Sequence, residues 1–440
     1  MAAKQQQDGA KASQGTTPAA YSGATRLTPA LRAAGLVLAQ LMRAGMLGAP
    51  LEGLPALKVG GTWENVYALA KHDSVEAIAW AGLGEAARAA LSEELRKAWG
   101  SAADLTLLRQ LQFDVERERI TAQMETDGLS WLPLKGVLIG AYYPRPGLRS
   151  MADNDILYGF VEPEPDGRGF RIKGATEAER AETVERGTEE IVRIMKGLGY
   201  RGEHVGASKD DCFYKEPMFN FEMHRGLMDD MDEDIPAFCA YYKNPWLRAR
   251  QDGDEPLRFL FSPADEYLYF LAHAYKHFSR AGCGVRFIAD EWVLLGHYGE
   301  ALSGPYLEGE LEKLGLVEFD RLIRDMAQAL FGGEGTAPEL TEDQQRLWFY
   351  LLGCGTYGTT ENRVAHKLQE LAEEGKSAGE ARAEYLGSRF FPSYTWCCRY
   401  YPVLRGRKWL YPGFLVFRIV RGVVVHPGRL LGELRVILRR

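Results

Sequence analysis

The sequence predicts a mixed α/β (α+β) protein: a small mixed sheet flanked by one helical region before it and another after it. Three observations predict this class. Residues 26–126 repeat apolar side chains at three- and four-residue spacing, which is typical of helices. Residues 127–235 show short apolar runs that end at Gly or Pro, as strands and turns do. From Ser262 onward the helical spacing returns.

The first helical region contains four segments with helical periodicity. They are LTPALRAAGLVLAQLMRAGM, DSVEAIAWAGL, EAARAALSEELRKAWG and TLLRQLQFDVERERITAQMETDG. The last ends at Gly128, a residue type that is common just after a helix.

The central region reads as alternating strands and helices. A strand at 131–136 closes on a glycine, and a brief helix follows that Pro144 and Pro146 end. An amphipathic helix with capping-box spacing between Thr176 and Glu179 comes later. The other expected strands are 151–161, 200–205, 211–216 and 218–227, with a loop after the first of them. This order favours a compact sheet with helices on one side.

The second helical region begins with a Ser-Pro-x-Asp helix start at Ser262. VRFIADEWVLLGHYG, VEFDRLIRDMAQALFG and DQQRLWFYLLGCG continue the pattern. The expected organisation is a disordered leader (1–25), a helical N-terminal region (26–126), a sheet core (127–235), a helical C-terminal region (236–398) and a basic amphipathic tail (399–440). The leader lacks the apolar core of a signal peptide, and no run of about 20 apolar residues could span a bilayer.

Charge is unevenly distributed along the chain. The formal net charge is −7, but residues 399–440 hold ten Lys and Arg against one Glu, or +9, which leaves −16 for the other residues. Such a tail suits either an anionic membrane surface or docking on the acidic body or on a partner. The acidic remainder makes nucleic acid an unfavoured partner.

The six cysteines form no Cys-x-x-Cys pair. This spacing argues against a zinc ribbon or a disulfide framework and fits a reducing cytoplasm. We therefore expect a cytoplasmic protein, with peripheral membrane contact through the tail left open.

Two aspartates carry the clearest chemical signal. Asp153 and Asp155 are two apart on an expected strand, so their carboxylates project from the same face. Carboxylates this close repel unless a cation lies between them, and Mg²⁺ prefers such oxygen ligands. Glu222, on another expected strand, is placed to supply a third carboxylate. The turn at Lys135 and Gly136 adds a cation and helix-start N–H groups, which suit phosphate oxygens.

The run LPLKGVLIGAYYPRPGLRSMADNDILY resembles the signature of the uncharacterised bacterial nucleotidyltransferases of the polymerase-beta-like superfamily. In that family Leu-Lys-Gly, a small helix, Tyr-Pro-x-Pro-x-x-Arg and an Asp-x-Asp strand follow in this order. The resemblance continues through a helix ending in Leu-Gly-Tyr and covers residues 125–300. Its further motifs are Glu222 with His224, His273 with His277, and Arg286 with Asp290.

This resemblance implies roles for individual residues. Asp153, Asp155 and Glu222 would be catalytic and would bind the metal; Lys135, Gly136 and Arg149 would contact phosphate. Two departures stand out. Lys135-Gly136 replaces the usual Gly-Ser and removes a hydroxyl, and Asn154 replaces the usual apolar residue between the aspartates, on the opposite face of the strand.

Three histidines are weaker candidates. His273 and His277 lie four residues apart on an expected helix, where they would pack in the core, contact substrate or, least favoured, share a metal. His224 shares a strand face with Glu222 and would either orient that carboxylate, touch substrate or be an ordinary buried histidine. The glycine-rich GCGTYGTTENR lacks the P-loop pattern and is expected to be a loop.

The predicted function is magnesium-dependent transfer of a nucleoside monophosphate from an NTP, ATP being favoured, to an unidentified hydroxyl or amine of a small molecule or protein. Pyrophosphate is the other product. The alternative is a catalytically inactive nucleotidyltransferase-fold protein that acts through nucleotide or partner binding, and the missing Gly-Ser hydroxyl motivates it. The sequence identifies neither the base, the acceptor nor the oligomeric state.

Overall fold

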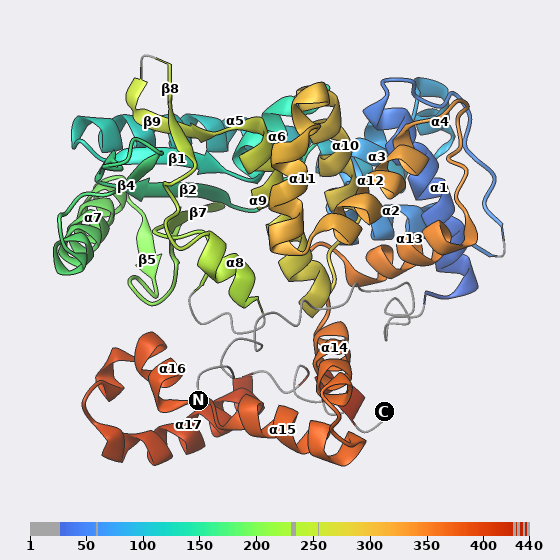
Figure 1. Cartoon of the computed structure of the whole chain (residues 1–440). Coiled ribbons are helices and arrows are strands. Elements are labelled where there is room, and N and C mark those ends of the chain that lie inside the picture. The colour runs from blue at the N-terminus through green and yellow to red at the C-terminus, as the bar shows by residue number, and fades with distance from the viewer. Residues whose placement is uncertain are drawn as a thin grey trace, which may run out of the picture.

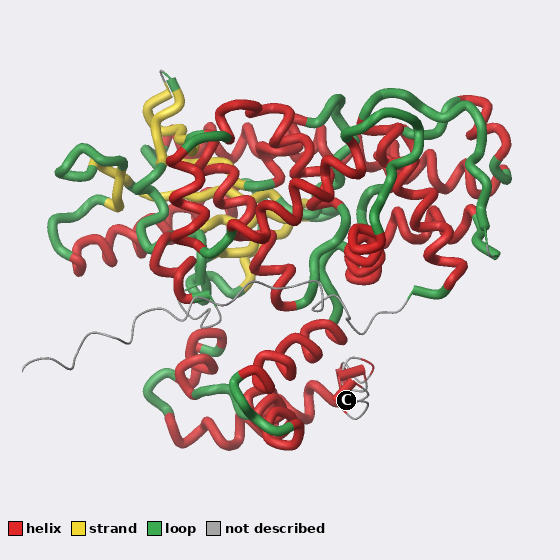
Figure 2. The backbone as a smooth tube through the Cα atoms, turned by 45° about the vertical axis from the view of Figure 1, so that its right-hand side comes forward, coloured by secondary structure: helices red, strands yellow, loops and turns green. Residues whose placement is uncertain are grey.

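The computed structural model describes residues 27–58, 60–229, 235–253 and 255–425, together with 428, 432, 433, 436 and 437. The expected leader (1–25) and much of the tail after 425 lie outside the described residues. Helices predominate, and the main strands gather into one sheet (Figure 2). The predicted mixed α/β class is confirmed.

The N-terminal helices lead into one long helix that connects them to the sheet. They are α1 (Pro29–Met46), α2 (Trp63–His72), α3 (Glu76–Ala81), α4 (Glu85–Ala90) and α5 (Glu93–Thr126). Thr28 and Ser92 cap α1 and α5 by accepting hydrogen bonds from backbone N–H groups three residues on. Trp99, early in α5, packs against Trp80, whereas Phe113 and Ile120 further along α5 belong to the core under the sheet.

A seven-stranded mixed sheet forms the centre, with strand order β5-β6-β7-β2-β1-β9-β8. Its strands are β1 (Ser130–Leu134), β2 (Asn154–Gly159), β5 (Arg201–Glu203), β6 (Asp210–Lys215), β7 (Phe219–His224), β8 (Ala249–Asp252) and β9 (Glu255–Phe261). β2 runs antiparallel to β1 and parallel to β7, and β9 runs parallel to β1. β8 and β9 were not foreseen; through β9 the sheet continues past the expected core boundary at residue 235.

Helices cover both faces of this sheet, whereas the sequence had favoured one side only. On one face, α5 and α7 (Glu177–Gly197) enclose an apolar core with Ile156, Tyr158 and Phe221. Asp155 and Glu222 alternate with these residues and therefore project from the other face. That second face is covered by α6 (Gly136–Tyr142) and, further along the chain, α9 (Pro263–Arg280).

The later helices pack against the first ones, far away in the sequence (Figure 1). After α8 (Pro236–Tyr241) and α9 come α10 (Arg286–Tyr298), α11 (Pro305–Leu314), α12 (Val317–Phe331) and α13 (Glu342–Cys354). Trp348 Nε1 donates to Gly35 O at 2.9 Å, and Arg43 Nη1 donates to Leu330 O at 3.0 Å. The two helical regions therefore share one core around α1.

The last helices form a lobe beside this body, visible at the bottom of Figure 1. They are α14 (Thr360–Glu373), α15 (Ala378–Phe390), α16 (Tyr394–Tyr400) and α17 (Tyr411–Val425). Arg399 connects the lobe to the sheet region by an ion pair with Asp229, Nη1 to Oδ1 at 2.9 Å. Within the part of the chain that the structure describes, no helix is long and apolar enough to cross a membrane.

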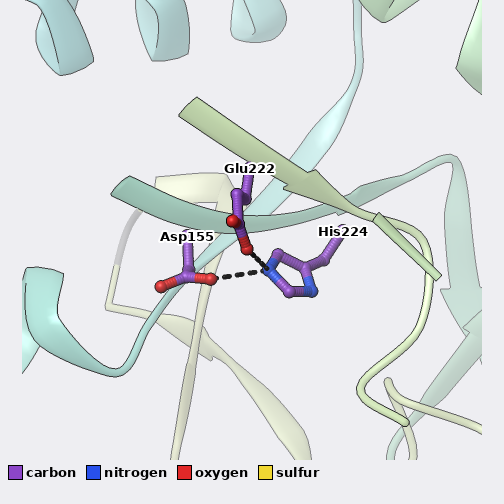
Figure 3. Close-up of side chains that lie close together, drawn as sticks. All are labelled: Asp155, Glu222 and His224. Atoms are coloured by element: carbon purple, nitrogen blue, oxygen red, sulfur yellow. Dashed lines mark hydrogen bonds and ion pairs between the residues drawn. The ribbon is translucent and has the colours of Figure 1, made fainter. Parts of the chain in front are cut away.

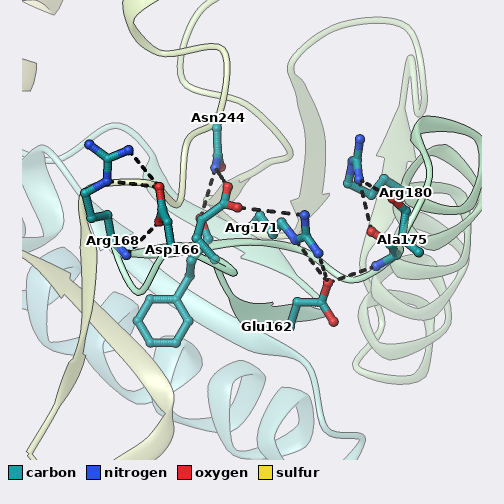
Figure 4. Close-up of polar contacts among 10 residues, drawn as sticks. Glu162, Asp166, Arg168, Arg171, Ala175, Arg180 and Asn244 are labelled. Atoms are coloured by element: carbon teal, nitrogen blue, oxygen red, sulfur yellow. Dashed lines mark hydrogen bonds and ion pairs between the residues drawn. The ribbon is translucent and has the colours of Figure 1, made fainter.

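The loop expected after β2 is a two-stranded hairpin, β3 (Val161–Pro163) and β4 (Phe170–Ile172) (Figure 4). Glu162 accepts from Arg171 at 3.1 Å across the two strands, and Asp166 accepts from the backbone N–H of Arg168 at 2.9 Å in the turn. Asn244 Nδ2 donates to Glu164 at 3.1 Å and joins the hairpin to the segment before β8. These charges are paired with one another, so the hairpin is a structural element at the edge of the core.

Candidate active site

Parallel pairing of β2 with β7 builds the site. Asp155 lies directly opposite Glu222 in this register, and His224 lies opposite Leu157, so all three project from the face that α6 and α9 cover. Asp155, Glu222 and His224 each present a ligand atom, and these atoms lie within 4.8 Å of one another (Figure 3). The expected meeting of Asp155 with Glu222 is thus present.

Asp155 is buried and receives two donors on one oxygen. Lys135 Nζ and His224 Nε2 each lie 2.7 Å from its Oδ1. Burial alone would raise the pKa of Asp155, but the charge of Lys135 and the His224 hydrogen bond hold this pKa well below 3.8. Asp155 is therefore a buried, ionised carboxylate.

Lys135, directly after the last residue of β1, has a strained backbone conformation. Its φ is +49°, a region that residues with a Cβ rarely adopt, and such strain costs roughly 1–3 kcal/mol. The conformation turns the chain into α6 and brings the ammonium to Asp155. Although burial alone would lower the pKa of Lys135, the charge of Asp155 raises it, so the side chain stays a cation.

His224 has both ring nitrogens engaged. Nε2 contacts Asp155, and Nδ1 lies 3.2 Å from Nζ of Lys209, which also pairs with Asp210 at 2.7 Å. Burial and then the charge of Lys209 lower the pKa of His224 to about 4, so the ring is neutral at pH 7. An ionised aspartate can only accept and an ammonium can only donate, so the ring proton is on Nε2. His224 thus orients Asp155, whereas the sequence had suggested Glu222 as the carboxylate that it orients.

Glu222 and Asp153 complete a group of three acids. Burial, with the negative charges of Asp155 and Asp153, raises the pKa of Glu222 to about 8. Burial and the charge of Asp155 raise the pKa of Asp153 as well. Asp153 lies one residue before β2, not on the strand, and does not belong to the 4.8 Å cluster of Asp155.

The donor set fits a hard divalent cation. Carboxylate oxygens are the ligands that Mg²⁺ prefers, and burial together with crowded like charges raises the pKa of Glu222 and of Asp153, as expected of acids that a cation would stabilise. Both nitrogens of the neutral His224 are already hydrogen-bonded, one to Asp155 and one to Lys209. The residues suited to hold such an ion are therefore Asp155 and Glu222, with Asp153 beside them.

Arg149 occupies a buried ion pair. Its Nε and Nη2 donate to the two oxygens of Asp290 on α10 at 2.8 and 2.9 Å. Its Nη1 lies beside Gly136, where a Cβ would come within 2.4 Å of that nitrogen. Gly136 is therefore required for space at the start of α6. Arg286, at the start of α10, donates to Ser150 O at 3.0 Å and holds the same loop.

One side of α9 forms the wall opposite the acids. Tyr269, His273 and His277 recur every four residues, and the two histidine rings lie 4.6 Å apart. Burial and then the charge of Lys135 lower the pKa of both histidines, that of His277 to about 4. Both are therefore neutral at pH 7, and substrate contact by them stays a prediction.

Sequence reasoning missed four contributors to this site. Lys209 and Asp210 become visible only from the β6–β7 register, in which Asp210 lies opposite His224. Tyr269 could have been found by extending the His273–His277 spacing back by four residues. Among the described residues its buried hydroxyl has no hydrogen-bond partner; burial raises the pKa of Tyr269, and the charge of Lys135 opposes that rise. Tyr357 lies in the glycine-rich loop; its side chain is 62% exposed, and partial loss of water contact and then the charge of Asp153 raise its pKa.

Comparison with known proteins agrees with the geometry. The model of a family described as "Uncharacterised nucleotidyltransferase" matches residues 60–160 and 184–332, more than half of the chain. The chain belongs to this family. No curated protein and no solved structure matches it.

The nucleotidyltransferase match covers the residues of the site. Its first segment contains Lys135 and Asp155, and its second contains Glu222, His224 and His273. Most of the β3–β4 hairpin and the lobe of α14–α17 lie outside it. Membership indicates nucleotidyl transfer as the general activity and a nucleotide as substrate.

Proposed function

We propose that this protein transfers a nucleoside monophosphate from an NTP, with ATP the favoured donor, to an acceptor hydroxyl or amine. The acceptor oxygen or nitrogen bonds to the α-phosphorus, the bond from that phosphorus to the bridging oxygen breaks, and pyrophosphate leaves. The observation that carries the proposal is the juxtaposition of Asp155 and Glu222 on parallel strands beside the buried ammonium of Lys135.

Each side chain has a proposed part in this reaction. Asp153, Asp155 and Glu222 would hold Mg²⁺, which when bound supplies positive charge to the phosphate oxygens and acidifies the attacking group. Glu222 is the most accessible member of the cluster, with 24% of its side chain exposed against 6% for Asp155. It is therefore the carboxylate nearest to the acceptor, and once the charge of a bound Mg²⁺ lowers its pKa it would either complete the metal site or take the proton of the acceptor.

The cations are proposed to neutralise the triphosphate. Lys135 remains charged, and Nη1 of Arg149 lies at Gly136, where the backbone turns into α6. Positive groups fixed before the reaction stabilise the charge that moves onto the leaving pyrophosphate. Neutral His273 and His277, with Tyr269, would contact the base or the acceptor from α9.

The test is transfer of label from an α-³²P-labelled NTP into an extract of small molecules, with pyrophosphate release measured in parallel. Asp155→Asn and Glu222→Gln keep the side-chain shape and remove the charge, so both should abolish transfer. Glu203→Gln is the matched control, because Glu203 lies on edge strand β5 and pairs only with exposed Arg201 among its described contacts.

Transfer that survives in both site variants would overturn the assignment of the site. A wild-type protein that binds an NTP with magnesium but never releases pyrophosphate would support the alternative of an inactive binding protein.

A further inference from the structure

Helix α17 has an apolar face that nothing described in the structure covers. None of its fifteen residues is buried, although most are Val, Ile, Leu or Phe. Six large apolar side chains on it are between 48% and 72% exposed: Val416, Phe417, Val420, Val423, Val424 and Val425. At about 100° per residue all of them except Val425 share one face spanning about 120° of the helix. A helix on an ordinary protein surface would place polar residues there.

The other face of α17 fixes its orientation on the lobe. Arg418 Nη1 donates to Arg389 O at 3.0 Å, and its guanidinium lies 5.3 Å from the ring centroid of Trp396. The ring of Phe414 lies 4.6 Å from that of Tyr401. These contacts hold the valine face outward. α17 itself packs on the lobe, whereas Arg399, the first residue of the basic tail, pairs with Asp229 of the acidic body.

Cations surround the apolar face. Residues 399–425 contain six Lys and Arg and no acid. Arg405, Arg407 and Lys408 are exposed and lead directly into Trp409, whose side chain is 77% exposed, and Arg421 is exposed on α17 itself. Exposed aliphatic and aromatic side chains beside basic ones are the composition of a helix that lies in a membrane interface.

We propose that α17 and residues 403–409 bind an anionic lipid surface. The valine face and Phe417 enter the boundary between headgroups and acyl chains, Trp409 lies at headgroup level, and Arg405, Arg407 and Lys408 contact lipid phosphates. Because Arg418 and Arg421 interrupt its apolar residues, the described part of α17 suits a position along the membrane surface.

The charge and the apolar face of α17 favour a lipid bilayer over two other partners, a second copy of the chain and a nucleic acid. Pairing with a second copy through the same face would bring two sets of cations together across a two-fold axis. A nucleic acid would attract the cations but would leave the valine face, which has no hydrogen-bonding side chain, exposed. An anionic lipid bilayer matches both the charge and the apolar face.

The test is flotation of the full-length protein with vesicles of phosphatidylcholine alone or mixed with phosphatidylglycerol. Wild type should float with the mixed vesicles only, and high salt should weaken the binding. Val416→Glu/Val420→Glu should abolish flotation. Arg407→Gln/Lys408→Gln should weaken vesicle binding by about 30-fold, because each cation near an anionic surface contributes roughly fivefold to the affinity.

The matched control is Val317→Glu, an exposed valine (43%) at the start of α12, which should float like wild type. Because the substituted residues are exposed, the variants should keep the circular dichroism spectrum of the wild type. The proposal is overturned if wild type does not float, or if the Val416→Glu/Val420→Glu variant floats as well as wild type. It is also overturned if that variant instead dissociates a wild-type dimer in sedimentation, which would assign the face to a second copy.

Discussion

The buried ion pair between Arg149 and Asp290 gives a prediction whose size can be worked out. Only 9% of the Arg149 side chain and 3% of the Asp290 side chain are exposed, and two hydrogen bonds of 2.8 and 2.9 Å join them. Tyr143 donates a third bond to Asp290 at 2.7 Å. Asp290→Asn keeps the shape but leaves the guanidinium buried without a counter-charge. Removing one partner of a buried pair costs about 3–5 kcal/mol. Because Asn still accepts one bond, we expect about 3 kcal/mol.

The assay is urea unfolding followed by circular dichroism, comparing the free energy of the main transition. The control is Glu318→Gln, which breaks the exposed pair of Arg321 with Glu318 and should cost no more than about 1 kcal/mol. The double variant Arg149→Met/Asp290→Leu should recover much of the loss, since a buried pair can often be replaced by apolar residues. Equal unfolding of Asp290→Asn and Glu318→Gln would refute the reasoning that this pair anchors the loop before β2.

Two further predictions concern stability. Burial raises the pKa of Glu291 from 4.5 to about 8. The contribution of Glu291 to the free energy of unfolding is therefore complete below pH 4.5 and is lost as the pH rises through 8. Relative to Glu291→Gln, wild type should lose up to about 5 kcal/mol of unfolding free energy over this range, at ~1.36 kcal/mol per pH unit; a difference that does not change with pH would contradict this. Gly136→Ala should cost about 1–3 kcal/mol, since its Cβ would meet Arg149 at 2.4 Å. Gly140→Ala on the same helix, with no contact under 3.8 Å, should be neutral or stabilising; equal effects would refute the steric account.

Part of the site could be predicted because each of its residues stands in a local sequence pattern. Lys135, Gly136, Asp155 and Glu222 were all located from local patterns, and the strand register then brought the two acids together. Asn154 was expected on the opposite face, and there its Oδ1 accepts from Arg117 on α5 at 2.8 Å. Alternation along a strand is a local property, so a single sequence reveals it.

Features that depend on distant contacts could not be predicted in this way. Lys209 contacts His224 only because β6 pairs with β7, and a single lysine before a strand has no local signature. β8 has only four residues, of which three are polar, and Glu255, Pro256 and Arg258 interrupt the apolar residues of β9, so neither strand shows a strong apolar alternation. Trp348 bonding to Gly35 joins residues 313 apart, which no periodicity reveals.

The most direct test of the active-site assignment is isothermal titration of the full-length protein with each of the four NTPs, with and without magnesium. The comparison variant is Asp153→Asn/Asp155→Asn, which preserves side-chain size. The account predicts magnesium-dependent binding of an NTP by wild type and loss of that binding in the variant. Equal binding without magnesium, or unchanged binding in the variant, would contradict the claim that these carboxylates hold the metal and its nucleotide.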